Sequence, residues 1–202
     1  MGPYSLKLVT APSSQAITLA DAKKQVEIAS SIDYHDEHLT RCIKAATQQA
    51  QIHAGRQILT ATYRLTLDDF PSDRISLPMP PLIAVTHIKY YDANGTEQTL
   101  ATTVYKALTD CEPGQIVLKH GQDWPTVYDE PGSVAITYTA GEAATLLAAG
   151  AHVEWIKQAI LLLTQAYFLR DLGKPYQEAL KAAENILESH RCGDDFVRYG
   201  DE

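Results

Sequence analysis

Two stretches near the start of the chain repeat apolar residues at helical spacing. Thr18 precedes the first stretch, and an Asp three positions later completes a pattern that resembles a capping box. This predicts a helix over about residues 19–29. A second helix is expected to begin at a cap formed by Asp33 or Asp36 and to end at Gly55. Its apolar stripe consists of Leu39, Ile43, Ala46 and Ala50. We expect the two helices to form an antiparallel pair.

After Gly55 the apolar pattern changes from a helical to an alternating period. Residues 61–67 place Tyr and Leu on one face and Thr and Arg on the other, as expected for a half-buried strand. Asn94-Gly95 between two alternating runs predicts a tight hairpin. Prolines around Pro80 exclude a central strand there. Further strands are predicted at 75–77, 84–91, 96–100, 104–107, 115–119 and 133–139.

The most apolar helix is predicted over residues 153–172, where two apolar stripes run side by side. The first stripe is Val153, Ile156, Ile160, Leu163 and Tyr167, and the second is Trp155, Ala159, Leu162, Ala166 and Leu169. A helix that is apolar on two faces needs two packing partners. One is expected to be the N-terminal helix pair, and the other is either the last helix or a neighbouring subunit. Pro175 separates this helix from a final one that stops near His190.

This order of elements predicts an α+β fold, in which a small helical bundle is interrupted by an antiparallel β insertion. We expect N-terminal helices in 16–57, the β insertion in 58–142, and C-terminal helices that complete the bundle in 151–190. Residues 191–202 form an acidic tail that is expected to be mobile. The bundle core is expected to contain Ile43, Ile156, Ile160 and Leu163.

Composition places the chain among soluble globular proteins, since 45% of its 202 residues are hydrophobic and 21% are charged. A net charge of -8 argues against wrapping nucleic acid, because that affinity comes largely from cations that neutralise phosphates. The charge is compatible with lining a channel through which DNA slides. No apolar run approaches the roughly 20 residues of a membrane span, and the N-terminus lacks a signal peptide.

Candidate chemical groups are few. The three scattered cysteines, Cys42, Cys111 and Cys192, contain no CxxC pair, so they predict neither a disulfide framework nor a zinc knuckle. Cys42 lies on an apolar helix face and is interpreted as a packing residue rather than a nucleophile. Neighbouring strand residues point to opposite faces, so Asp68 and Asp69 are interpreted as a strand-end turn rather than as an acid/base pair.

A run of polar residues before the second helix contains potential metal ligands, namely Asp33, His35, Asp36, Glu37 and His38. A solvated helix start, where acids favour the positive end of the helix dipole, is the preferred interpretation. His35 and His38 are three residues apart and lack the spacing of an i, i+4 zinc pair. The tyrosines of the strand region are interpreted as core and interface residues rather than a ligand site. We therefore expect no catalytic residue, metal or cofactor.

Several segments occur in an order that resembles the head-to-tail connector family of tailed phages. They are Leu-Asp-Asp-Phe-Pro at 67–71, Ile-Ser-Leu-Pro-Met-Pro-Pro-Leu at 75–82, Ile-Lys-Tyr-Tyr-Asp-Ala-Asn-Gly at 88–95, Trp-Pro at 124–125 and Val-Ala-Ile-Thr-Tyr-Thr-Ala-Gly at 134–141. The resemblance covers about residues 18–187. It implies a helical core that packs side by side with copies of itself, twelve to match the portal, and that extends the DNA channel.

The function implied by this resemblance is that of a structural, non-enzymatic ring subunit beneath the portal, joining capsid to tail. Its expected partners are copies of itself, the portal protein and the next tail-side connector protein, with DNA passing without specific binding and no membrane. Its expected location is the virion, after assembly in the host cytoplasm. The residues expected at subunit or portal contacts are Trp155, Tyr167, Phe168, Phe196 and Tyr199.

Two other functions stay open at this point. One is a monomeric module that binds a ligand or peptide through the aromatic β insertion. The other is a metal-dependent hydrolase that uses the polar residues from Asp33 to His38. Mass measurement with and without portal separates the ring from the monomer, and a metal assay tests the hydrolase.

Overall fold

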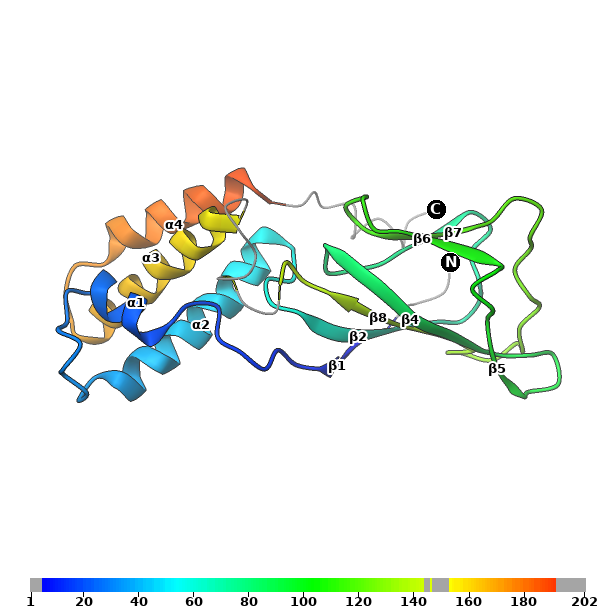
Figure 1. The fold of residues 1–202 in the computed structure, drawn as a ribbon, viewed down its shortest axis with the longest axis horizontal. Coiled ribbons are helices and arrows are strands. Elements are labelled where there is room, and N and C mark those ends of the chain that lie inside the picture. The colour runs from blue at the N-terminus through cyan, green and yellow to red at the C-terminus, as the bar shows by residue number, and fades with distance from the viewer. Residues whose placement is uncertain (1–4, 144–145, 147–152, 192–202) are drawn as a thin grey trace. The chain divides into compact units, whose positions relative to one another are not determined.

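The computed structural model describes residues 5–143, 146 and 153–191. In the described part, the chain divides into two compact units, each made of two separate segments. Residues 5–11 and 60–141 form the sheet unit, and residues 12–59 with those from 142 onward form the helical unit. Four helices and two antiparallel sheets confirm the predicted α+β class (Figure 1).

The helical unit is built around one central helix. Its elements are α1 (Leu19–Gln25), α2 (Asp36–Ala54), α3 (Glu154–Asp171) and α4 (Gln177–Ser189). The helix α3 packs against all three others (Figure 1). Both faces of α3 are therefore covered within the chain, as its two apolar stripes require.

The starts and ends of α1 and α2 follow from single residues. The Thr18 hydroxyl accepts a hydrogen bond of 3.0 Å from the backbone N–H of Asp21, which confirms the predicted cap of α1. Gly55 has a φ of 63° and ends α2 as predicted, because this left-handed conformation costs glycine least. The prediction that Asp33 or Asp36 caps α2 is wrong. His35 holds the cap position without a side-chain hydrogen bond, and the Asp36 carboxylate lies 2.6 Å from the Lys23 ammonium group instead.

The core of the helical unit is almost fully closed to solvent. Ile43, Ile156 and Ile160 have no exposed surface, and Leu163 is nearly as buried. A smaller apolar cluster joins Leu39 of α2 to Phe168 of α3. These side chains tie the N-terminal and C-terminal segments of the unit together, although more than 100 residues separate them in the sequence.

The two segments of the helical unit also meet where the chain leaves it and returns. A β-bridge joins Leu59 to Ala143, and the backbone N–H of Glu142 donates to the Ile58 carbonyl at 3.1 Å. The Glu142 carboxylate lies 3.3 Å from the Arg56 guanidinium, and both side chains are nine-tenths buried. The sheet unit is therefore inserted between two adjacent points of the helical unit.

The sheet unit contains one five-stranded and one three-stranded antiparallel sheet. The five-stranded sheet has the order β1 (Ser5–Thr10), β2 (Ala61–Leu67), β8 (Val134–Ala140), β4 (Leu82–Tyr91) and β5 (Glu97–Thr99). The three-stranded sheet has the order β3 (Arg74–Ser76), β7 (Gln115–Leu118) and β6 (Tyr105–Leu108). Apolar residues of both sheets belong to one shared core.

Strand register aligns apolar residues into rows on the core face. Leu65 of β2 lies opposite Ile136 of β8, which in turn lies opposite Ile88 of β4. All three are buried, as expected when directly paired residues share a face of the sheet. Tyr138 of β8 is fully buried in the neighbouring row, and its hydroxyl donates a hydrogen bond of 2.7 Å to the Pro78 carbonyl. The alternation read from residues 61–67 is confirmed.

The strand β1 was not predicted, because the expected order began with a helix. It pairs with β2, more than 50 residues away, and its side chains are mostly exposed. Only Leu6, opposite Leu65, packs on the core. A strand that buries one side chain and finds its partner far along the chain leaves little local pattern, which is why periodicity does not reveal it.

Candidate functional site

The candidate metal ligands before and within the first turn of α2 do not converge. Glu37 pairs with Arg41 at 2.7 Å, and Asp36 pairs with Lys23. The His35 ring lies edge-on to Phe168, with ring centroids 5.4 Å apart. Each of these side chains therefore has its own contact. Among the described residues, His38 is the one member of this group that lies near other metal-binding groups.

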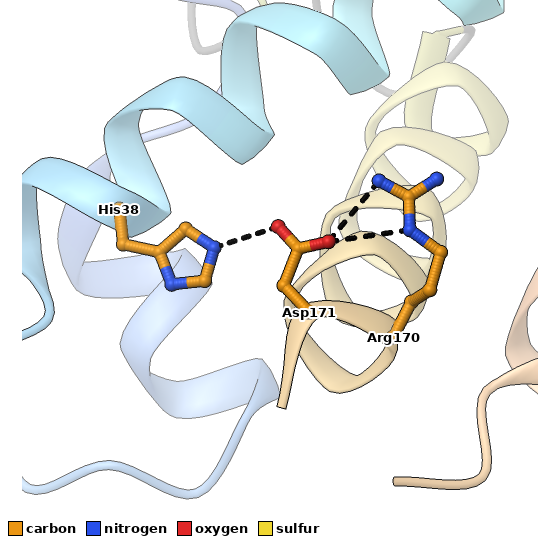
Figure 2. Close-up of polar contacts among 3 residues, drawn as sticks. All are labelled: His38, Arg170 and Asp171. Atoms are coloured by element: carbon orange, nitrogen blue, oxygen red, sulfur yellow. Dashed lines mark hydrogen bonds and ion pairs between the residues drawn. The ribbon is translucent and has the colours of Figure 1, made fainter. Parts of the chain in front are cut away.

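His38 binds Asp171, which lies at the far end of the central helix. The His38 Nε2 atom is 2.9 Å from the Asp171 Oδ2 atom, and 133 positions separate the two residues in the chain (Figure 2). The other carboxylate oxygen, Oδ1, accepts hydrogen bonds of 3.2 Å from Nε and Nη2 of Arg170. Figure 2 shows the carboxylate held between the two side chains. These contacts, with the His38 hydrogen bond the largest, lower the pKa of Asp171.

Cys42 lies one helical turn after His38 and completes a mixed cluster. Its Sγ, a ring nitrogen of His38 and a carboxylate oxygen of Asp171 all lie within 4.8 Å of one another. Burial raises the pKa of the thiol, and the Asp171 carboxylate raises it further. Cys42 is buried beside Leu39 and Phe168, which confirms the packing role expected for it.

A second notable feature lies on the outer face of the five-stranded sheet. Lys7 of β1 lies directly opposite Arg64 of β2, and both side chains are exposed. Within the described part of the chain, neither cation has an ion pair or a side-chain hydrogen bond. The same row continues through Thr137 to His87. We call Lys7, Arg64 and His87 the basic row. Like charges directly opposite each other destabilise a sheet, so the basic row is suited to an anionic partner.

The residues expected at subunit contacts have different surroundings. Trp155 is half-buried and stacks on His190, with ring centroids 4.2 Å apart. Tyr167 is half-buried below the Arg170 guanidinium, which lies 5.1 Å from its ring. Phe168 is 3% exposed and offers little surface to a partner. Phe196 and Tyr199 lie outside the described residues.

The candidate acid/base and ligand-binding residues of the strand region stabilise the fold. Asp68 accepts a hydrogen bond from the backbone of Gly132, and Asp69 accepts one from the backbone of Phe70, so both stabilise turns. Among the tyrosines of the region, Tyr63, Tyr105 and Tyr138 are buried in the core of the sheet unit. Among the described residues, no helix combines the length and apolarity that a membrane crossing requires.

Two residues of these sites escape sequence reasoning. Asp171 is more than 100 residues from His38, so nothing local links them. Its position near the end of a predicted helix, with Arg170 beside it, was the available signal. Lys7 belongs to the strand that periodicity does not reveal. Arg64 was predicted on the polar face of its strand, but that Lys7 lies opposite it depends on the register between β1 and β2.

No protein-family model matches the sequence, and no curated protein sequence matches it significantly. Solved structures do match. A chain from the neck of a native GTA particle with C12 symmetry aligns with a TM-score of 0.73 and 24% identity, over 94% of this chain and 96% of that chain. A chain from the virion of a native gene transfer agent (GTA) particle aligns with a TM-score of 0.74 and 23% identity, over 93% of this chain and 95% of that chain. A chain from the neck of an empty GTA particle with C6 symmetry aligns with a TM-score of 0.69 and 24% identity, over 81% of this chain and 83% of that chain. At this identity the likeness establishes the shared fold.

Proposed function

We propose that this chain is a structural, non-enzymatic subunit of the head-to-tail connector ring of a tailed phage or phage-like particle. The observation that supports this most is the shared fold. It extends over nearly the full length of a chain from a GTA neck and of a chain from a GTA virion, the sheet unit included. The segments at 67–71, 75–82, 88–95 and 134–141 point to the same family independently of the fold.

In the proposed assembly, copies of the chain pack side by side in a closed ring beneath the portal. The symmetries of the matched neck structures suggest six or twelve copies, and twelve is the number expected beneath a portal. A ring of this kind needs heterologous contacts, in which one face of a subunit meets a different face of the next. The ring would join the portal to the next tail-side protein and let DNA pass without specific binding.

The charge distribution supports one contact between neighbouring subunits of the proposed ring. The chain has a net charge of -8, so acidic side chains outnumber basic ones on each copy. The basic row is a local patch of positive charge on this acidic protein. We propose that it contacts acidic side chains of the neighbouring copy, which would neutralise Lys7 and Arg64 together. The half-buried rings of Trp155 and Tyr167 are further proposed contacts, and Phe196 and Tyr199 are proposed for docking on the portal.

The proposed role needs no catalytic group or cofactor. The virion is its proposed location, after assembly in the host cytoplasm. The alternative of a monomeric ligand-binding module draws less support, because three of the tyrosines that would form its site are buried in the core.

The test is to measure the mass of the purified chain in solution, alone and mixed with its portal, and to image the product by electron microscopy. We expect a ring of the chain on the tail-side face of the portal, with twelve copies per portal. The same mixture is then made with the double variant Lys7→Glu, Arg64→Glu, which removes the two facing cations. This variant should keep its fold but form fewer rings than the parent. A chain that stays monomeric and never associates with portal would contradict the proposal.

A further inference from the structure

We propose that His38, Cys42 and Asp171 form a binding site for a divalent transition-metal ion of the zinc type. The inference does not depend on the proposed ring function, because it rests on three side chains inside the helical unit.

The geometry comes from the helical spacing of α2 and the end of α3. His38 and Cys42 are four residues apart, so both project from one face of α2. Asp171 comes from the last turn of α3 and already touches His38. In a tetrahedral zinc site, ligands about 2.0–2.3 Å from the metal lie about 3.3–3.8 Å from one another. The three ligand atoms lie within 4.8 Å of one another, and His38 Nε2 is 2.9 Å from Asp171 Oδ2, so small side-chain rotations can bring them to this spacing.

The donor types select the metal. A thiolate, an imidazole nitrogen and one carboxylate oxygen suit Zn²⁺ and Co²⁺, whereas Mg²⁺ and Ca²⁺ prefer oxygen ligands alone. On binding, the metal replaces the thiol proton of Cys42, which passes to solvent. In the metal-free chain the Nε2–H of His38 donates to the Asp171 carboxylate. When the metal binds, the ring exchanges this proton through solvent for one on Nδ1, and the freed Nε2 lone pair binds the metal. The thiolate and the Asp171 carboxylate together neutralise the two positive charges of the ion.

The surroundings support binding as well. Arg170 holds Oδ1 of Asp171, which leaves Oδ2 directed at His38 and orients the carboxylate for a metal. The apolar side chains of Leu39 and Phe168 cover the thiol. The His38 and Asp171 side chains keep 23% and 40% of their surface exposed, so an ion can enter from solvent and a water molecule can fill the fourth position.

The bound ion would join two helices from opposite ends of the sequence. His38 and Cys42 belong to the segment before the sheet unit, and Asp171 belongs to the segment after it. Because the unfolded chain does not hold these ligands together, binding would stabilise the folded helical unit.

The test uses the full chain with Cys111→Ser and Cys192→Ser, which leaves Cys42 as its one thiol. The metal-free protein is titrated with Co²⁺, whose bond to a thiolate gives a charge-transfer absorption band. We expect one equivalent to bind, the band to disappear when Zn²⁺ is added, and no effect of Mg²⁺. Zn²⁺ alone should raise the melting temperature of this protein.

Variants then identify the ligands. Cys42→Ala should abolish the band. Because Cys42 is buried, His38→Gln and Asp171→Asn provide a second test at more exposed positions, and each should weaken Co²⁺ binding by about tenfold or more. His53→Gln, on the same helix but outside the cluster, is the matched control and should bind like the parent. Absence of the band in the folded parent would overturn the proposal, and so would a band that survives both His38→Gln and Asp171→Asn unchanged.

Discussion

At the scale of single residues, the stability of the helical unit depends on buried side chains of its central helix, which packs against the three other helices. Ile160 has no exposed surface and lies in a core formed by residues from both segments of the unit. A cavity at this position removes contacts with helices that are distant in sequence. Interiors are packed closely enough that such a loss is only partly relieved by relaxation.

We therefore expect Ile160→Ala to destabilise the chain by about 2–5 kcal/mol. Ile160→Asp should be more severe, because it buries a carboxylate without a partner. Gln158→Ala, at an exposed position of the same helix, is the matched control and should change stability by less than about 0.5 kcal/mol. Urea unfolding measures both, and equal midpoints for the parent and Ile160→Ala would refute the core assignment.

The pKa of Asp171 makes one contribution to stability depend on pH. Its folded pKa lies below the value of about 3.9 expected in the unfolded chain. The stabilisation is therefore fully present above about pH 4 and is lost as the pH falls through the lowered pKa. Because the side chain is 40% exposed, we expect less than about 1 kcal/mol.

In metal-free buffer, Asp171→Asn should be less stable than the parent at about pH 6, and the difference should shrink at about pH 3. Urea unfolding at both pH values measures it. Asp123→Asn, an exposed carboxylate outside the helices, serves as a control for the loss of one acidic charge. A difference that grows as the pH falls would show that the sign is wrong.

At the scale of elements, most helices and strands were predictable because their apolar residues recur locally. The helix α3 and the strand β2 have the limits expected from their periods, to within one residue. The local pattern did not predict which strands pair or which side chains meet across the fold. The strand β1, the partner of His38 and the order of the five-stranded sheet all depend on residues far apart in sequence. The predicted cap of α2 was wrong because the Asp36 carboxylate forms an ion pair with Lys23 instead of accepting a hydrogen bond from the helix backbone.

The pairing of β1 with β2 leads to a prediction about the basic row. Removing one of two facing cations should relieve repulsion, so Lys7→Thr should leave the isolated chain as stable as the parent or stabilise it by about 0.2–1 kcal/mol. The gain should shrink in high salt, because salt screens exposed charges. Lys106→Thr, at an exposed position of β6, is the control and should show no such gain. Clear destabilisation by Lys7→Thr would mean that Lys7 has a favourable role in the folded chain.

At the scale of the whole molecule, the proposed attachment to portal depends on the acidic tail. Phe196, Val197 and Tyr199 form a short apolar group among acidic residues and glycines. Ordering such a segment costs about 1–2 kcal/mol per residue in backbone entropy, so these side chains must fill a real pocket on the partner.

We expect Phe196→Ala with Tyr199→Ala to weaken attachment to portal and to leave the melting temperature of the isolated chain nearly unchanged. Sedimentation with portal and thermal unfolding measure the two effects separately. Truncation after His190 should have the same result. Undiminished assembly of the truncated chain on portal-containing heads would rule out the tail as the anchor.

The insertion of the sheet unit between Leu59 and Glu142 has a consequence for the order of folding during synthesis. The ribosome completes the described strands by residue 140, whereas α3 ends at Asp171. The apolar face of α2 is made early, but it stays uncovered until α3 has emerged. The sheet unit is therefore expected to fold first on the nascent chain, and α2 is expected to need protection from aggregation until α3 has left the ribosome.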